Sequence, residues 1–130
     1  MNNNFKQERE DLAAAFRWTA RLNMHEAVAN HFSLAVNESG SQFLLNPIGM
    51  HFTEITASDL ILIDANVKNT MSQPNAPDPT AWAIQSALHS NNPQARCILD
   101  VHPPNATILS HPNYKAMKPI HQTNNRFAAL

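Results

Sequence analysis

The chain has little cysteine, no excess of charge of either sign and no long hydrophobic run. Its single cysteine, Cys97, excludes an internal disulfide and, because it lies in an apolar segment, is predicted to be a small buried side chain. Nine basic and ten acidic residues lack the clustered positive charge of a nucleic-acid surface. No apolar run approaches the ~20 residues of a membrane span, and residues 1–6 lack the apolar core of a signal peptide. We therefore expect a cytoplasmic protein with neither nucleic-acid nor membrane partners.

The composition is that of a globular domain. Hydrophobic residues make up 43% of the chain and charged residues 15%, which argues against disorder and against a coiled coil. A domain of this size buries about two thirds of the surface that its unfolded chain exposes. We expect residues 1–130 to form a single domain.

The first half of the chain predicts a helix followed by a hairpin. Over residues 7–23, Leu12, Phe16 and Ala20 recur every four positions, which favours an amphipathic helix. Two runs with strand character, 32–36 and 42–47, flank a polar turn that contains a glycine and predict a β-hairpin.

The middle of the chain predicts a further strand and a second helix. In the run 60–64, the first four residues are apolar at successive positions, which predicts a strand that is central or covered on both faces. After a loop over 65–78, Asp78 as N-cap and Pro79 at the first helical position predict a helix that continues through His89. Phe16 and Trp82 are interpreted as core anchors. Other histidines, expected not to bind metal, are His25, His51, His89, His111 and His121.

The next segment combines an apolar strand with two side chains that bind metals. Residues 97–102, between Pro93 and the prolines at 103–104, predict a buried strand of about six residues. Asp100 and His102 then share one face at the strand end. A cation held there could polarise a carbonyl or activate a water, so the pair is a candidate metal site. The alternative is an ordinary strand end with a surface Asp and a turn-facing His.

Several segments taken together resemble the class II aldolase/adducin family, from about residue 10 to the C-terminus. They are residues 30–33, 43–49, 52–60, 79–82 and 100–103. The resemblance implies an α/β/α sandwich around a central, mainly antiparallel sheet, and an oligomer with active sites between subunits. Family enzymes are zinc-dependent aldolases and epimerases of small sugar phosphates. His31 and the run at 80–82 are more similar to the adducin-like branch, which includes non-catalytic domains.

Transferred residue by residue, the resemblance implies a degenerate metal site. The family's His-x-His becomes Asp100 and His102, and a third His lies roughly fifty residues further on in the family, beyond Leu130. These two residues are the predicted metal ligands, with zinc as the implied cofactor. The family's catalytic Glu corresponds to Ala81, which cannot transfer a proton, so no catalytic residue is predicted.

The same residue-by-residue comparison predicts only part of the family's substrate site. Asn30, Gly49 and Thr80 match phosphate-binding positions of the family and are the predicted substrate residues. Ile48 and Pro79 stand where hydroxyl-bearing residues are expected. Two further departures from the pattern are Ala29 in place of a glycine and Gln85 in place of a histidine common in adducin-like members.

Three functional hypotheses remain open. One is a residual metal-dependent aldehyde-lyase, in which a cation at the strand end stabilises an enediolate and the substrate residues hold a small phosphorylated sugar. Another is a non-catalytic, adducin-like association module. The third is a truncated remnant of a longer aldolase or epimerase, because residues 126–130 resemble a helix that has only begun. An incomplete sheet exposes apolar surface, so we expect a homo-oligomer or a covering partner.

Overall fold

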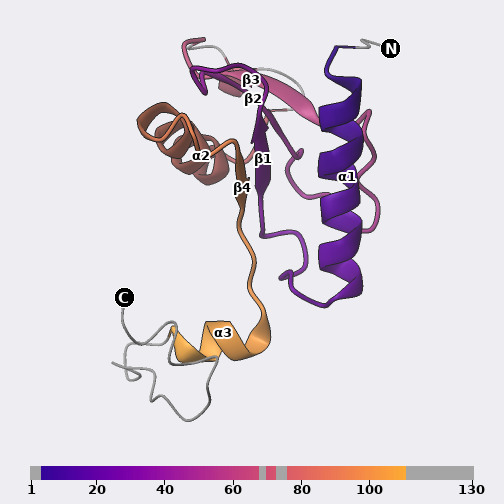
Figure 1. Cartoon of the computed structure of the whole chain (residues 1–130). Coiled ribbons are helices and arrows are strands. Elements are labelled where there is room, and N and C mark those ends of the chain that lie inside the picture. Colours follow the sequence, from indigo (N-terminus) through magenta and orange to yellow (C-terminus); the bar gives the residue numbers. More distant parts are fainter. Residues whose placement is uncertain (1–3, 68–69, 73–75, 111–130) are drawn as a thin grey trace.

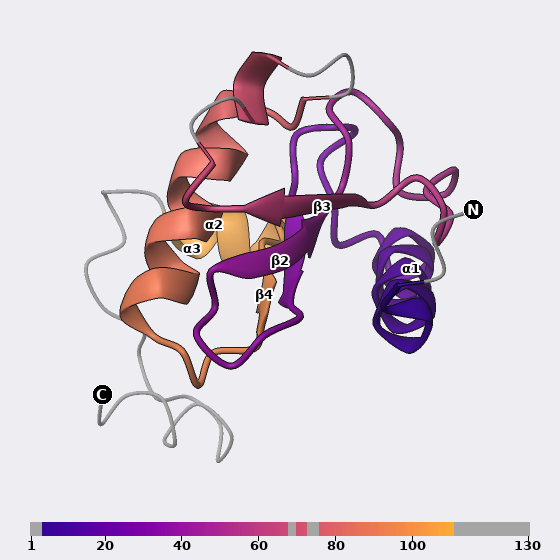
Figure 2. The ribbon, with the colours of Figure 1, turned by 90° about the horizontal axis from the view of Figure 1, so that it is seen from above.

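The computed structural model describes residues 4–67, 70–72 and 76–110. Within this part of the chain, four strands form one sheet in the order β3-β2-β1-β4, and every neighbouring pair is antiparallel. Helix α1 (Lys6–Arg21) lies on one face of the sheet and helix α2 (Pro79–Asn91) on the other (Figure 1, Figure 2). The predicted α/β/α sandwich around an antiparallel sheet is confirmed.

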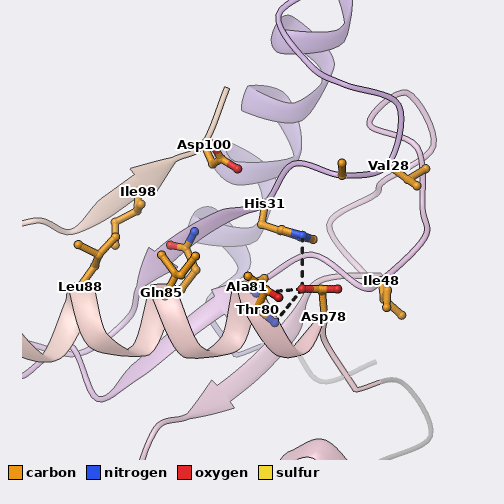
Figure 3. A pocket seen from close by; sticks show the side chains of 12 residues that line it. Val28, His31, Ile48, Asp78, Thr80, Ala81, Gln85, Leu88, Ile98 and Asp100 are labelled. Carbon is orange, nitrogen blue, oxygen red and sulfur yellow. Dashed lines mark hydrogen bonds and ion pairs between the residues drawn. The ribbon is translucent and has the colours of Figure 1, made fainter. Parts of the chain in front are cut away.

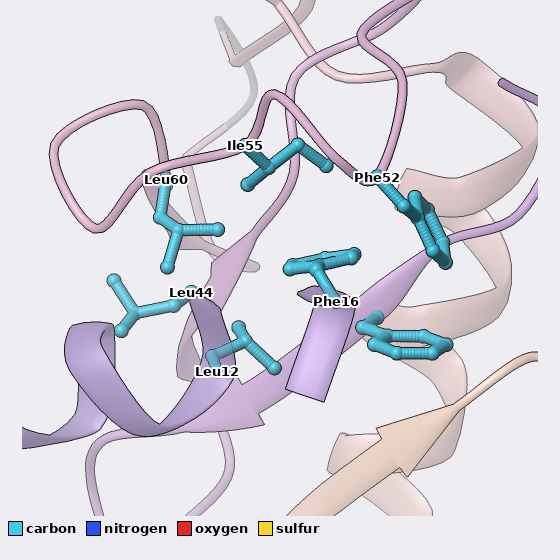
Figure 4. Close-up of a cluster of buried hydrophobic side chains, with 7 residues drawn as sticks. Leu12, Phe16, Leu44, Phe52, Ile55 and Leu60 are labelled. Atoms are coloured by element: carbon cyan, nitrogen blue, oxygen red, sulfur yellow. The ribbon is translucent and has the colours of Figure 1, made fainter. Parts of the chain in front are cut away.

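Helix α1 covers its face of the sheet with an apolar cluster. Leu12 and Phe16 are buried, as their spacing predicts, and the Phe16 ring stacks on Phe32 with 4.7 Å between centroids. Phe52 meets the Phe16 ring edge-on at 4.6 Å. The whole α1 cluster (Figure 4) consists of Leu12, Phe16, Phe32, Leu44, Phe52, Ile55 and Leu60.

The predicted hairpin forms the centre of the sheet. Strand β1 (Phe32–Ala35) pairs with β2 (Gln42–Leu45), with Leu34 opposite Leu44. Gly40 in the connecting turn has φ = 71°, a left-handed conformation that glycine adopts without steric cost. The turn chemistry and the alternation of the two runs therefore agree with the structure.

The two outer strands of the described sheet correct three predictions. Strand β3 (Ile61–Asp64) pairs with β2 at one end of the order and is not central, and Leu62 remains 36% exposed because it points to the face opposite its apolar neighbours. Strand β4 (Cys97–Leu99) has three residues, and only its middle residue is partly buried. Cys97 is exposed, because it points away from α2 and β4 pairs only with β1 in the described sheet.

The segments around α2 set up the site. A short 3-10 helix, η1 (Thr70–Ser72), lies in the loop before α2, and α2 begins at Pro79 with Asp78 as its N-cap, as predicted. A third helix, α3 (Pro104–Leu109), follows β4 and lies apart from the sheet (Figure 1); the sequence did not predict it. No helix in the described ranges is long and apolar enough to span a membrane. The predicted helix start at 126–130, His111 and His121 lie outside those ranges.

Candidate functional site

A groove of about 690 Å³ opens between α2, β4 and the segment that leads into β1. Aliphatic side chains occupy both ends, with Val28 and Ile48 at one end and Leu88 and Ile98 at the other (Figure 3). Polar side chains lie between these ends. The lining residues are Val28, Ala29, His31, Ile48, Asp78, Thr80, Ala81, Ile84, Gln85, Leu88, Ile98 and Asp100.

The first turn of α2 brings a carboxylate into the groove. Asp78 Oδ1 accepts hydrogen bonds from the backbone N–H groups of Thr80 at 2.8 Å and Ala81 at 3.0 Å. A helix N-terminus attracts anions because its first N–H groups are unpaired and carry partial positive charge. Here the protein's own carboxylate occupies two of those groups, so a phosphate would have to compete with it.

His31 lies between two carboxylates in the middle of the groove. Its Nε2 is 3.9 Å from Asp78 Oδ1, and its Nδ1 is 3.4 Å from the amide nitrogen of Asn46, which can only donate. Nε2 of His31 thus faces a carboxylate acceptor and Nδ1 faces an amide donor. Burial lowers the pKa of His31, although Asp78 and Asp100 oppose the shift. His31 is consequently uncharged at neutral pH.

The two predicted metal ligands lie next to each other at the end of β4. Asp100 Oδ1 is 3.5 Å from His102 Nε2, as the two-residue period of a strand predicts. Asp100 lines the groove, and its Oδ2 is 3.4 Å from the amide nitrogen of Asn30. His102 is not among the lining residues, and its Nδ1 is 2.8 Å from Glu26 Oε2.

This donor set does not fit a zinc ion. The carboxylates of Glu26 and Asp100 face different nitrogens of the His102 ring, so the imidazole bridges them and the three groups do not converge on one point. Zinc sites normally use at least three protein ligands. Across the described residues, no group of three or more His, Cys, Asp or Glu side chains could hold a metal ion. At Ala81, where the family resemblance predicts the position of a catalytic Glu, a buried methyl group lines the groove.

Only one of the three predicted substrate residues lines the groove. Thr80 does so, at the start of α2. Asn30 is buried and holds other residues: its side-chain oxygen accepts from the Glu26 backbone N–H and its amide nitrogen faces Asp100. Gly49 lies in a turn with φ = 73° and outside the lining set. The structure thus does not bring these three residues together in the groove.

Behind the groove, a buried polar network joins α2 to β1. Ser33 Oγ lies 2.6 Å from Gln85 Oε1 and 2.7 Å from His89 Nε2, and His89 Nδ1 is 3.1 Å from the carbonyl oxygen of Ala95. Burial lowers the pKa of His89, and the nearby positive charge of Arg96 lowers it further, against the carbonyl of Ala95. His89 therefore has a structural role in joining α2 to β1.

Sequence reasoning did not select His31, Asp78 or Gln85 as site residues. One signal was present: His31 precedes Ser33 by two positions, which places both on the α2 face of a strand. Asp78 was interpreted only as a helix cap, and Gln85 only as a departure from the family pattern. The three residues lie at one site because α2 packs on β1 and β4. A local sequence pattern does not specify this packing.

The comparisons with known proteins agree with this architecture. The model of the class II aldolase and adducin N-terminal domain matches residues 10–129, and the chain belongs to this family. A Pseudomonas aeruginosa protein assigned by name to aldolase class 2 is 38% identical over 96 residues, which cover 74% of this chain and 37% of that protein. Adducin-related protein 1 of Caenorhabditis elegans is 31% identical over 103 residues, which cover 73% of this chain and 13% of that protein.

Solved structures show the same fold. The aldolase II superfamily protein from Pseudomonas syringae superposes with a TM-score of 0.69 and 29% identity, over 85% of this chain and 42% of that one. The L-fuculose 1-phosphate aldolase from Glaciozyma antarctica superposes with a TM-score of 0.63 and 27% identity, over 78% of this chain and 42% of that one. The chain thus spans less than half the length of these relatives.

Proposed function

We propose that this domain is a non-catalytic, ligand-binding member of the class II aldolase/adducin family. The observation that carries the proposal is Ala81, whose methyl group faces the groove where the family resemblance places the catalytic Glu. Proton transfer needs a titratable group within hydrogen-bond reach of the substrate, and a methyl group supplies none. His31 also lines the groove, but its two ring nitrogens face Asp78 and the amide of Asn46.

The donor set at the end of β4 supports the same proposal. Asp100 and His102 are held by each other and by neighbouring side chains, and the third polar group, Glu26, is on the other side of the imidazole. A catalytic zinc keeps one open coordination position beside three protein ligands. The alternative function, a residual metal-dependent aldehyde-lyase acting on a small phosphorylated sugar, needs a metal that these residues do not fit.

Metal analysis of the purified chain tests this proposal. We expect less than about a tenth of an equivalent of tightly bound transition metal, and no rise in melting temperature with added zinc, because ligands that bind the native state raise its stability. His102→Ala is the matched control. Stoichiometric zinc that disappears in this variant would contradict the proposal and support the lyase. Zinc that persists in the variant would be bound elsewhere and would leave the proposal standing.

The proposal includes self-association. On the face of the sheet that α1 covers, Leu62 of β3 is 36% exposed and Leu99 of β4 is 49% exposed, one at each end of the described sheet. Exposed apolar side chains on outer strands favour contact with another chain. Sedimentation velocity should therefore detect a homo-oligomer, and Leu99→Lys should shift it toward monomer. A wild-type chain that stays monomeric at high concentration would contradict this part of the proposal.

A further inference from the structure

The groove contains acidic groups without a basic side chain to balance them. Asp78 and Asp100 both line it, and no Lys or Arg side chain does so among the described residues. His31 lies between them, and a proton on its ring would offset only one of the two negative charges. His102, which faces Asp100, also faces the carboxylate of Glu26. The local charge is therefore negative, which disfavours a phosphate in the groove.

A buried amide adds a second, independent feature. Gln85 is 2% exposed and lines the groove between the carboxylates and the aliphatic end. Its Oε1 is 2.6 Å from Ser33 Oγ, whereas its amide nitrogen has no hydrogen-bond partner among the described residues. This nitrogen is not among the fully buried, unpartnered side-chain atoms of the described residues, so it reaches the surface of the groove that Gln85 lines. The amide of Gln85 is therefore a donor for an acceptor oxygen of a ligand in the groove.

The third feature is the exposed aliphatic wall. Ile84 and Leu88, one turn apart on α2, are 51% and 40% exposed at the groove. Across from them, Ile98 of β4 completes an apolar end next to Gln85 (Figure 3). Removing such a surface from water contributes about 25 cal/mol per Å². A ligand with an aliphatic part gains this contribution.

We propose that the groove binds a small aliphatic amino alcohol as its ammonium ion. The carboxylates of Asp78 and Asp100, on either side of His31, attract the ammonium, the hydroxyl oxygen accepts from the amide of Gln85, and the alkyl part covers Ile84 and Leu88. This ligand class rests on the proposed non-catalytic function, since it uses the same groove. It replaces the phosphorylated sugar that the family resemblance implies for this chain.

A titration monitored by amide proton–nitrogen NMR tests the ligand class on the full chain. The probes are leucinol, which has all three features, N-acetylleucinol, which lacks the positive charge, isoamylamine, which lacks the hydroxyl, and inorganic phosphate. We expect leucinol to shift the resonances of Ala81, Gln85 and Ile98 saturably. Isoamylamine should bind several-fold more weakly than leucinol, and N-acetylleucinol and phosphate at least about tenfold more weakly, which corresponds to about 1.4 kcal/mol.

Two charge-neutralising variants locate the ammonium. Asp78→Asn and Asp100→Asn should each weaken leucinol binding about three- to tenfold, and Asp78→Asn keeps a residue that caps helices well. Glu38→Gln, in the exposed hairpin turn, removes the same charge far from the groove and should leave binding unchanged. If Asp78→Asn does not fold, as judged by its melting curve, Asp100→Asn and the probe series decide.

Three results would overturn the proposal: no saturable shift with leucinol, phosphate binding as tight as leucinol binding, or leucinol binding that is unchanged in every folded Asp variant. Failure of the proposed function gives a different result. Metal-dependent turnover of a phosphorylated sugar would contradict that function directly, whatever the leucinol titration shows.

Discussion

The two faces of the sheet differ in the polar side chains that they bury. On the α1 face, three phenylalanines, Phe16, Phe32 and Phe52, pack together in the α1 cluster, and Thr19 is the polar residue among the buried residues of α1. On the α2 face, Ser33, Gln85 and His89 are buried and hydrogen-bonded behind an open groove. This polar network lies on the same face as a second apolar cluster, which consists of Ala35, Phe43, Leu45, Ile61, Ile63 and Ala81.

The buried polar side chains of the α2 face lie next to the groove, which suits a binding site. Buried polar networks fix geometry but contribute less net stability than apolar packing of the same volume, and each unpaired member is costly. The polar network on the α2 face carries that cost next to the groove, and the apolar clusters on the two faces supply the compensating stability. Substitutions on the two faces should therefore differ in size and in their dependence on pH.

The largest effect is expected on the α1 face. Phe16→Ala removes a fully buried ring that contacts Phe32 and Phe52, and should lower the free energy of unfolding by about 3–5 kcal/mol. Urea denaturation measures the change. Trp18→Ala on the same helix is the control, because Trp18 is 58% exposed. The control should cost less than about 1 kcal/mol. Equal losses in the two variants would contradict the assignment of this core.

The second largest loss of stability is expected at the close contact between Gly40 and His89. A Cβ at Gly40 would lie 2.5 Å from the backbone oxygen of His89, and Gly40 also has φ = 71°. Gly49 has φ = 73° with open space around it, so Gly49→Ala isolates the backbone strain of about 1–2 kcal/mol. Gly40→Ala should cost about 1–3 kcal/mol more than Gly49→Ala, because the neighbouring backbone must shift. Equal melting temperatures for the two variants would contradict this contact.

A pH dependence of stability should arise from His89. The folded state lowers the pKa of this buried imidazole, so the unfolded chain takes up a proton first as the pH falls. Stability is therefore full above the unfolded pKa of about 6.5 and decreases as the pH falls from there toward the folded pKa. His25 and His31, whose pKa values are also lowered by burial, add to the same slope.

Chemical denaturation from about pH 5 to pH 8 measures this slope, with His89→Gln as the comparison variant. The variant should show a shallower dependence between pH 5 and 6.5, because it lacks one of the titrating groups. A slope unchanged by His89→Gln would assign the effect to other groups and contradict the role of the α2 network.

The smallest effect on stability is expected at the groove wall. Ile84 is 51% exposed, so Ile84→Ser should change the free energy of unfolding by no more than about 0.5 kcal/mol. The same change should weaken leucinol binding, because it removes apolar contact surface. Thermal melting and the NMR titration measure the two quantities separately. A strongly destabilised Ile84→Ser would place this side chain in the core instead of the groove.

The sequence predicted the elements whose signals are local. The spacing of Leu12 and Phe16 gave α1 its buried face, and Asp78 before Pro79 gave the start of α2. The burial of the outer strands was predicted wrongly. An apolar run shows that a strand can be buried, but whether Leu62 or Cys97 is covered depends on which elements pack there, and this is a property of the tertiary structure.

The site was predictable only in part for the same reason. The proximity of Asp100 and His102 follows from strand geometry, and the structure has it. The substrate role of Asn30 stays a prediction, and in the structure its side chain contacts Glu26 and Asp100. The roles of His31 and Gln85 depend on contacts between elements far apart in the chain, and periodicity carries no information about these contacts.

The most direct test of the central claim is an aldol-cleavage assay with the purified chain. L-fuculose 1-phosphate, the substrate in the name of one structural relative, is incubated with the protein with and without added zinc. We expect no aldehyde product above the protein-free control in either condition, because Ala81 offers no acid/base group and the donors near Asp100 do not converge on a metal. Zinc-dependent product formation that Asp100→Ala abolishes would contradict the claim that this groove binds without catalysing.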